Sequence, residues 1–273
     1  MTTTHFYEYL SQTPQSNEQE FAIKNLFRIA RTKNPSDAEG ILQGLKALDL
    51  SSFPETKKYL MDSSFFKFMP HLTSLNLDYQ NITNLNDILF LSSLQRISLK
   101  GVGLSDFSFL FPLNNIEELI LEENNITTLS GIEKFINLKL LSLKKNKLRK
   151  IDEVAKLEKL VSLNVSENDI SDISFIKLMS HLKFFSANKN MIEDVSSVEK
   201  VKNLNTLSLA ENQINNVEPL QYLISLTKLD LRKNKIRNIK CLKELRNLFE
   251  LGLSGNPLYD DDYDLFPRSL RIE

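Results

Sequence analysis

The chain has a single cysteine, no excess of either charge and no glycine-rich phosphate loop. Because Cys241 is the one cysteine among 273 residues, an internal disulfide is excluded, and a reducing compartment or a bacterial origin is favoured. The 34 basic and 35 acidic residues give a formal net charge of -1, whereas nucleic-acid-binding proteins usually carry a strong basic excess. Gly101-Val102-Gly103 is too short to cradle a phosphate. These absences argue against nucleic-acid and nucleotide binding.

Signals for export and membrane insertion are also missing. Residues 1–9 contain neither a basic segment nor an apolar core, so we expect no secretory signal peptide. No apolar run approaches the roughly 20 residues of a membrane-spanning helix. We therefore expect a cytoplasmic protein, or one exported to a host cell without a cleavable signal peptide, and no membrane partner.

A 22-residue pattern occupies most of the chain. Over residues 116–135 it reads I-x-x-L-x-L-x-x-N-x-I-x-x-L-x-x-I-x-x-F. Its copies begin at a constant spacing, at Leu72, Leu94, Ile116, Leu138, Leu160, Leu182, Leu204, Leu226 and Leu248. A fixed period of this length predicts a solenoid.

Within each repeat, the L-x-L step predicts a short strand, because alternate residues of a strand point to opposite faces. The fourth and sixth positions are apolar in every repeat, as in Leu119 and Leu121, so the strands stack into a parallel ladder. The remaining apolar residues recur every three positions, which favours 3-10 turns and extended segments over an α-helix. We expect a curved α/β solenoid with the parallel sheet on its concave face.

Asparagine occupies the ninth position in seven of the nine repeats. Its amide offers donors and an acceptor that can satisfy buried backbone groups of its own turn and of the adjacent repeat. The series is Asn124, Asn146, Asn168, Asn190, Asn212, Asn234 and Asn256. Gln80 and Val102 interrupt it, and we expect local irregularity at Val102, which cannot form these bonds.

These motifs resemble the 22-residue subclass of leucine-rich repeats found in phosphatase-regulator-like proteins and bacterial internalins. The resemblance covers Leu72 to about Leu258. It implies a scaffold for protein–protein recognition, without catalytic activity or cofactor. Two contexts fit it: a bacterial effector that engages a host protein, and a cytosolic regulatory subunit of a phosphatase-like enzyme. We expect a monomer that binds a protein partner.

The segments outside the repeats are predicted to cap them, because solenoids must shield the apolar ends of their terminal repeats. We expect a helical N-terminal cap over residues 1–71, nine repeats over 72–258 and a C-terminal cap over 259–273. Residues 1 to about 15 are expected to be loose, and helices are expected near 17–32, 36–48 and 53–62. Each helix begins at a candidate capping box: Ser16 with Gln19, Ser36 with Glu39, and Ser52 with Glu55. In the last segment, Leu265, Phe266, Leu270 and Ile272 are expected to fold back over the final repeat.

Chemistry-bearing residues are few, and we expect no catalytic, cofactor-binding or metal-binding site. Two other classes compete with the binding module. An enzyme would centre on Cys241 or on the aspartates between Asp260 and Asp264, which lack the glycine turn and distal glutamate of an EF-hand loop. An RNA-binding protein would use the basic turns at 144–150 and 232–240, which stand four repeats apart.

The predicted binding surface consists of the side chains that point outward from the strands. Most are small or polar, and the eighth repeat position alternates in charge from Glu123 to Lys233, which we interpret as self-neutralising. Large apolar, aromatic or arginine side chains at outward positions favour binding, because such residues anchor protein interfaces. The candidate protein-binding residues are Tyr79, Arg96, Ile120, Leu140 and Phe184.

Overall fold

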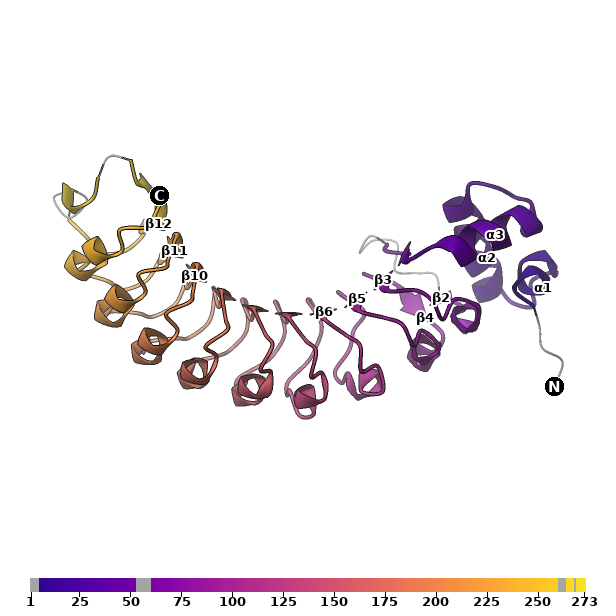
Figure 1. Ribbon diagram of the computed structural model, residues 1–273, viewed down its shortest axis with the longest axis horizontal. Coiled ribbons are helices and arrows are strands. Elements are labelled where there is room, and N and C mark those ends of the chain that lie inside the picture. The colour runs from indigo at the N-terminus through magenta and orange to yellow at the C-terminus, as the bar shows by residue number, and fades with distance from the viewer. Residues whose placement is uncertain (1–4, 53–59, 260–263, 268) are drawn as a thin grey trace. The chain divides into compact units, whose positions relative to one another are not determined.

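The computed structural model describes residues 5–52, 60–259, 264–267 and 269–273. The chain divides into two compact units, Met1–Asn124 and Asn125–Glu273. Each unit contains short parallel strands that alternate with 3-10 helices, so the predicted repeat architecture is confirmed (Figure 1). None of the helices in the described residues has both the length and the apolarity that crossing a bilayer requires.

The first unit opens with three α-helices: α1 (Phe6–Ser11), α2 (Asn17–Ala30) and α3 (Pro35–Gly44). Helix α2 begins as predicted, because the Ser16 hydroxyl accepts a hydrogen bond from the Gln19 N–H at 3.2 Å. The expectation of a loose segment up to about residue 15 is wrong for residues 6–11, since α1 buries Phe6, Tyr9 and Leu10, while residues 1–4 lie outside the described residues. The Phe6 ring stacks on that of Phe68, with the two centroids 5.0 Å apart.

Two other helix predictions need correction. Helix α3 is capped by Asn34, whose side-chain oxygen accepts the Ser36 and Asp37 N–H groups, so the expected cap at Ser36 is wrong. It also ends at Gly44, before the predicted end at 48. Most of the expected helix at 53–62, including Glu55, lies outside the described residues. The predicted end of this helix, at residues 60–62, is wrong, because residues 60 and 61 form strand β2 (Leu60–Met61), which pairs in parallel with β4 (Asn81–Ile82).

The strand ladder of the first unit contains β1, β3, β5 and β6 in that order. Their bounds are Ala47–Asp49, Ser74–Asn76, Arg96–Ser98 and Glu118–Ile120. Strand β1 was not predicted. Leu48 pairs with Leu75, which lies farther along the chain than one repeat, so the repeat period does not reveal this strand. The 3-10 helices in the described residues of this unit are Ser64–Phe68, Leu85–Phe90 and Ser108–Leu110.

The second unit contains seven parallel strands among its described residues, in chain order from β7 to β13. Their bounds are Leu140–Ser142, Ser162–Asn164, Phe184–Ser186, Thr206–Ser208, Lys228–Asp230, Glu250–Gly252 and Arg271–Ile272. One 3-10 helix, Ile132–Lys134, precedes β7, and the others in the described residues lie between successive strands: Asp152–Lys156, Ser174–Leu178, Ser196–Lys200, Glu218–Tyr222 and Lys240–Glu244. The strands lie along one side of the unit and the 3-10 helices along the other (Figure 1).

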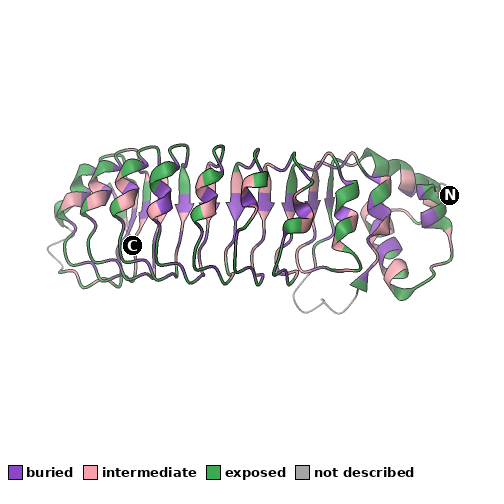
Figure 2. Ribbon diagram, turned by 90° about the horizontal axis from the view of Figure 1, so that it is seen from below, coloured by how far each residue is buried: buried purple, intermediate pink, exposed green. Residues whose placement is uncertain are grey.

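The core lies between the strands and the 3-10 helices, and the strand residues that face it are fully buried (Figure 2). Leu163, Phe185, Leu207 and Leu229 occupy equivalent places on successive strands. This register follows from the alternation of strand side chains and confirms the predicted inward positions.

The asparagines satisfy buried backbone groups of two repeats, as predicted. The Asn168 amide nitrogen donates to the Leu143 and Val165 carbonyls, at 3.0 Å each. Its oxygen accepts the Leu148 N–H at 3.0 Å. Beside Val102 the pattern is irregular, because the Asn124 oxygen accepts from both Gly103 and Leu104.

At the C-terminal end, the short strand β13 continues the ladder. Ile272 pairs in register with Leu251, and Leu270 is buried. Leu265 is exposed, so the expected folding back over the last repeat is wrong for this residue. Asp260, Asp261 and Asp262 lie outside the described residues.

Candidate protein-binding surface

We call the outward side of each strand ladder the strand face. It is built by the third and fifth residues of each repeat, whose side chains point away from the core because their neighbours point into it. In the first unit a hollow of about 230 Å³ lies on this face. Its lining residues are Ser74, Leu75, Asn76, Asp78, Arg96, Ile97, Ser98, Glu118 and Ile120.

Two predicted anchors, Arg96 and Ile120, therefore line the same hollow. Ile120 is half-buried on β6, and its apolar side chain is open to a partner. The Arg96 side chain is already paired, since its Nε lies 3.0 Å from the Glu118 carboxylate. An exposed pair of this kind contributes only about 0.2–1 kcal/mol, so a partner's carboxylate can compete for Arg96 at low cost.

Tyr79 is placed differently from the other anchors. It follows β3 with a left-handed φ of 57°, and it does not line the hollow. A side chain at Gly101 would collide with the Tyr79 ring, so glycine at 101 makes room for the aromatic group. The Lys100 ammonium lies 5.6 Å from the ring centroid. Burial alone lowers the pKa of Lys100, but hydrogen bonds with Tyr79 and Glu123 raise it above its ordinary value.

In the second unit, the predicted anchors Leu140 and Phe184 lie on β7 and β9, with β8 between them. Leu140 is half-buried, whereas 46% of Phe184 is exposed. Ser162 and Thr206 flank Phe184 in register on the neighbouring strands. Since neither of these neighbours is large, they leave the Phe184 ring open on the strand face.

The small polar residues beside Phe184 bond mainly to one another. The Ser166 and Ser186 hydroxyls are 2.9 Å apart, and the Ser166 hydroxyl also accepts the Asn188 N–H at 3.1 Å. The Asn188 oxygen accepts the Ala210 N–H at 2.7 Å. These bonds hold together the small polar residues around the C-terminal end of β9, which we call the platform.

Toward the end of the second unit, the strand face is charged and internally paired. Lys228 lies 2.8 Å from Glu250, and the hydrogen bond from this lysine lowers the Glu250 pKa. Asp230 binds Arg232 at 2.6 Å and raises its pKa, and Arg232 also lies 3.5 Å from Glu273. Charge here is neutralised within the protein, which leaves the neutral platform around Phe184 as the more available surface.

The eighth repeat position is a left-handed turn, a feature that sequence reasoning missed. All its non-glycine residues have φ between 53° and 58°: Tyr79, Glu123, Lys145, Glu167, Lys189, Glu211 and Lys233. The expected pairing along this row is confirmed for Glu211 and Lys233, at 3.4 Å. Glu167 pairs differently from this expectation, because its carboxylate lies 3.1 Å from the ammonium group of Lys144, which occupies the seventh position of the preceding repeat.

Sequence reasoning also missed Phe249, which is 51% exposed and follows the last repeat's first leucine. The Lys228 ammonium lies 5.3 Å from the centroid of its ring. The sequence signal was present, but at the second repeat position, beside the positions considered outward.

The structure gives little support to the residues considered as candidates for catalysis. Cys241 is half-buried, and its thiol lies 3.5 Å from the Val217 carbonyl. Burial raises the pKa of this thiol, which disfavours the thiolate nucleophile. Across the described residues, no three His, Cys, Asp or Glu side chains gather in a way that would hold a metal ion.

Comparison with known proteins finds a leucine-rich repeat match in part of the chain. The family model described as "Leucine rich repeat" matches residues 202–258. No relative is found among curated protein sequences. Similar solved structures include the internalin InlF from Listeria monocytogenes, at 22% identity and a TM-score of 0.69, covering 89% of this chain and 84% of that one.

Two further structures show the same fold. Internalin C2 from Listeria monocytogenes is 27% identical with a TM-score of 0.62, covering 71% of this chain and 84% of that chain. The ectodomain of the Arabidopsis thaliana receptor kinase GASSHO1/SCHENGEN3 is 24% identical with a TM-score of 0.57, covering 80% of this chain and 27% of that chain. It was solved in complex with CASPARIAN STRIP INTEGRITY FACTOR 2. The chain therefore has the leucine-rich repeat fold, as its repeats predicted.

Proposed function

We propose that this leucine-rich repeat protein is a non-enzymatic binding module that holds a protein partner on its strand face. The observation that carries the proposal is Phe184, a large aromatic side chain that is 46% exposed between the small residues Ser162 and Thr206 of the neighbouring strands. Aromatic residues are preferred anchors of protein interfaces, and their burial drives association. The receptor ectodomain solved in complex with CASPARIAN STRIP INTEGRITY FACTOR 2 has the same fold and supports this use.

The proposed anchors are the five predicted residues, which contribute in different ways. Ile120, Leu140 and Phe184 offer apolar surface on the strand face. Arg96 engages an acidic group of the partner by opening its pair with Glu118. Tyr79 contributes from the turn after β3, beside Lys100.

The proposed roles of the terminal segments follow from their elements. Residues 1–71 serve as the N-terminal cap of the nine repeats at 72–258, and 259–273 serve as the C-terminal cap. Strand β1 supports this role at the N-terminal end, because it pairs with β3 and covers the edge that β3 would otherwise expose. Strand β13 does the same for β12.

For the biological context, we propose a bacterial effector that acts on a host protein. The similarity to internalins of Listeria monocytogenes supports a bacterial context. A cytosolic phosphatase regulator is the second candidate, and the repeat length alone favours it.

Affinity capture with mass spectrometry tests the strand face. The double variant Ile120→Lys and Phe184→Ala is compared with wild type in host-cell and bacterial lysates, after circular dichroism has shown that its fold is intact. The matched control is Ile136→Lys with Leu178→Ala, two residues that are 65% and 66% exposed outside the strands. A partner lost only from the strand-face variant supports the proposal. A partner lost only from the control variant contradicts it.

A further inference from the structure

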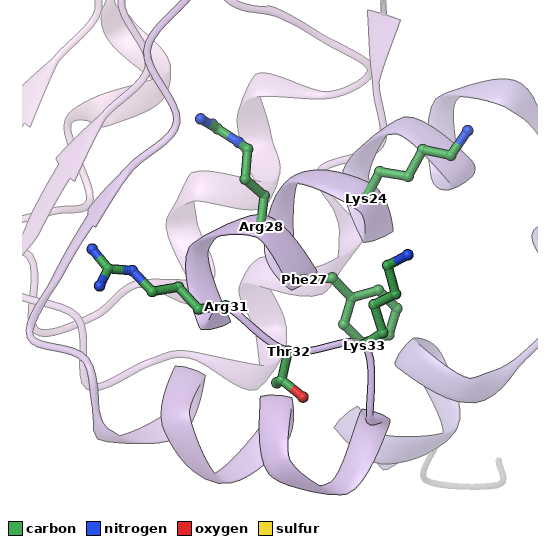
Figure 3. A pocket seen from close by; sticks show the side chains of 6 residues that line it. All are labelled: Lys24, Phe27, Arg28, Arg31, Thr32 and Lys33. Carbon is green, nitrogen blue, oxygen red and sulfur yellow. The ribbon is translucent and has the colours of Figure 1, made fainter.

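The end of helix α2 forms a second candidate surface, distinct from the strand face. A hollow of about 580 Å³ lies there, with a mostly apolar lining. It is lined by Lys24, Phe27, Arg28, Arg31, Thr32 and Lys33. Figure 3 shows the guanidinium groups of Arg28 and Arg31 extending to one side of the view and the ammonium groups of Lys24 and Lys33 to the other.

The positive charge of this hollow is only partly neutralised. Lys24 pairs with Glu20 at 2.5 Å, while Arg28 bonds to the uncharged amide of Asn25 at 3.3 Å. For Arg31 and Lys33, no ion pair is found with any residue in the described parts of the chain. Since the whole chain carries 34 basic and 35 acidic residues, four cations around one hollow represent a local separation of charge.

Hydrogen bonding to the last carbonyls of the helix does not account for these cations. Basic side chains often stabilise a helix C-terminus by hydrogen-bonding its last carbonyls. Here the backbone performs that task, because the Arg31 N–H binds the Arg28 and Phe27 carbonyls and the Thr32 N–H binds that of Phe27. The charges therefore remain available to a ligand.

Phe27 gives the hollow its apolar character. It is half-buried among the residues that line the hollow, so an inserted side chain can reach it. A membrane surface fits less well, because docking on lipid needs an apolar group that protrudes from the protein.

From this geometry we infer that the hollow at the end of α2 binds an acidic peptide segment of a protein partner. An aliphatic or aromatic residue of the segment packs on Phe27, and its flanking carboxylates engage Arg28, Arg31 and Lys33. Carboxylate and guanidinium groups pair through short, charge-assisted hydrogen bonds, which gives the site its preference for acidic segments.

Fluorescence anisotropy on the full chain tests this inference. The probe is a fluorescein-labelled nonapeptide with one central leucine flanked by four glutamates on each side. Two matched peptides replace the leucine by glycine or all glutamates by lysine. We expect the acidic leucine peptide to bind most tightly, the glycine peptide to bind more weakly and the lysine peptide not to bind. Equal binding of the acidic and lysine peptides, or no binding of either, would overturn the inference.

The informative variant is Arg28→Ser with Arg31→Gly. Arg31 has a left-handed φ of 55°, a conformation that glycine adopts without strain, so the change at position 31 removes a charge without straining the backbone. The control variant, Arg149→Ser with Lys150→Ser, removes two exposed cations from the second unit. We expect the first variant to weaken binding about three- to tenfold and the control to leave it unchanged. If the two variants weakened peptide binding equally, net charge alone would explain the effect, and the proposed site at the end of α2 would be refuted.

Two further measurements test whether a membrane surface or a second copy of this chain occupies the hollow instead. Co-sedimentation with vesicles containing phosphatidylserine, if lost in the Arg28 and Arg31 variant, would assign the hollow to a membrane instead. A concentration-dependent dimer in analytical ultracentrifugation, if abolished by the same variant, would assign it to a second copy of this chain. Either result would overturn the inference that the hollow binds an acidic peptide. Neither result would bear on the proposed binding of a partner to the strand face.

Discussion

Replacing Asn190 by alanine should destabilise the protein strongly, for a reason that can be followed bond by bond. The Asn190 amide nitrogen donates to the Val165 and Ala187 carbonyls at 3.1 Å each and to the Asn188 carbonyl at 3.2 Å, and its oxygen accepts the Ile170 N–H at 3.0 Å. The Val165 and Ala187 carbonyls each keep a second amide donor, from Asn168 and Asn212. The Ile170 N–H loses its acceptor in a fully buried position.

The expected loss of stability is the sum of the contributions of these lost hydrogen bonds. An unsatisfied buried N–H costs about 1–3 kcal/mol, and the hydrogen bonding of each of the two amide hydrogens, shared among three carbonyls, contributes about 0.5–1.5 kcal/mol. We therefore expect Asn190→Ala to lower the free energy of unfolding by about 3 kcal/mol. Urea-induced unfolding of the full chain, followed by circular dichroism, measures this quantity.

Asn203→Ala is the matched control. Asn203 is exposed and makes one hydrogen bond, from its amide to the Ser180 carbonyl at 2.8 Å. Its removal should cost less than about 1 kcal/mol, because water replaces the lost donor. If the two variants lost the same stability, the asparagine series would not carry the structural role assigned to it.

Three further predictions follow from single residues. Lys189→Gly should raise the free energy of unfolding by about 0.5–1 kcal/mol in urea titration, because it removes left-handed strain at φ 53°; a fall would contradict this. Alkylation of Cys241 by iodoacetamide at pH 8 should be slower than that of free cysteine, since burial raises its pKa and reduces the thiolate; equal rates in the folded protein would refute that effect. The Tyr9 hydroxyl donates to the Asp62 carboxylate at 2.7 Å, and its pKa is raised by burial and by that bond. Because the unfolded chain ionises first, the stability from Tyr9 is present below its ordinary pKa of 10.0 and is lost as the pH rises above it. Thermal unfolding of Tyr9→Phe should therefore show lower stability at pH 7 but a smaller further loss above pH 10, and an unchanged alkaline loss would argue against this role.

The repeating part of the fold could be predicted because its pattern is periodic. Leu119 and Leu121 mark a strand by their spacing, and Asn168 marks a buried turn by its chemistry. Both features recur with the period of the repeat, so a single error cannot shift the assignment. The parallel register of the strands then follows from the constant period.

The prediction failed where local chemistry departs from that period. Leu48 belongs to the ladder but precedes its partner Leu75 by more than one repeat length, so β1 was read as the end of a helix. Asn34 competed with Ser36 for the cap of α3, and both residue types favour that position. Phe6 and Tyr9 form part of a helix because they pack on the segment around Phe68, a contact that no local pattern reveals.

The candidate site was predictable to a smaller extent. Strand alternation places Ile120 and Phe184 on the strand face. In the structure Ile120 is half-buried there and Phe184 is exposed. The pair between Arg96 and Glu118 was not foreseen, although both residues occupy the third position of adjacent repeats. The hollow at Phe27 depends on where α2 ends and how its cations are arranged in space, which periodicity does not encode.

Photo-crosslinking tests the central claim, that the strand face holds a protein partner, most directly. Benzoylphenylalanine replaces Phe184 in one sample and Leu178 in another, because both positions are exposed but only the first lies on a strand. After irradiation in host-cell or bacterial lysate, we expect one discrete protein adduct from position 184 and none from position 178. An adduct from position 178 alone would contradict the account, because the partner would then lie outside the strand face.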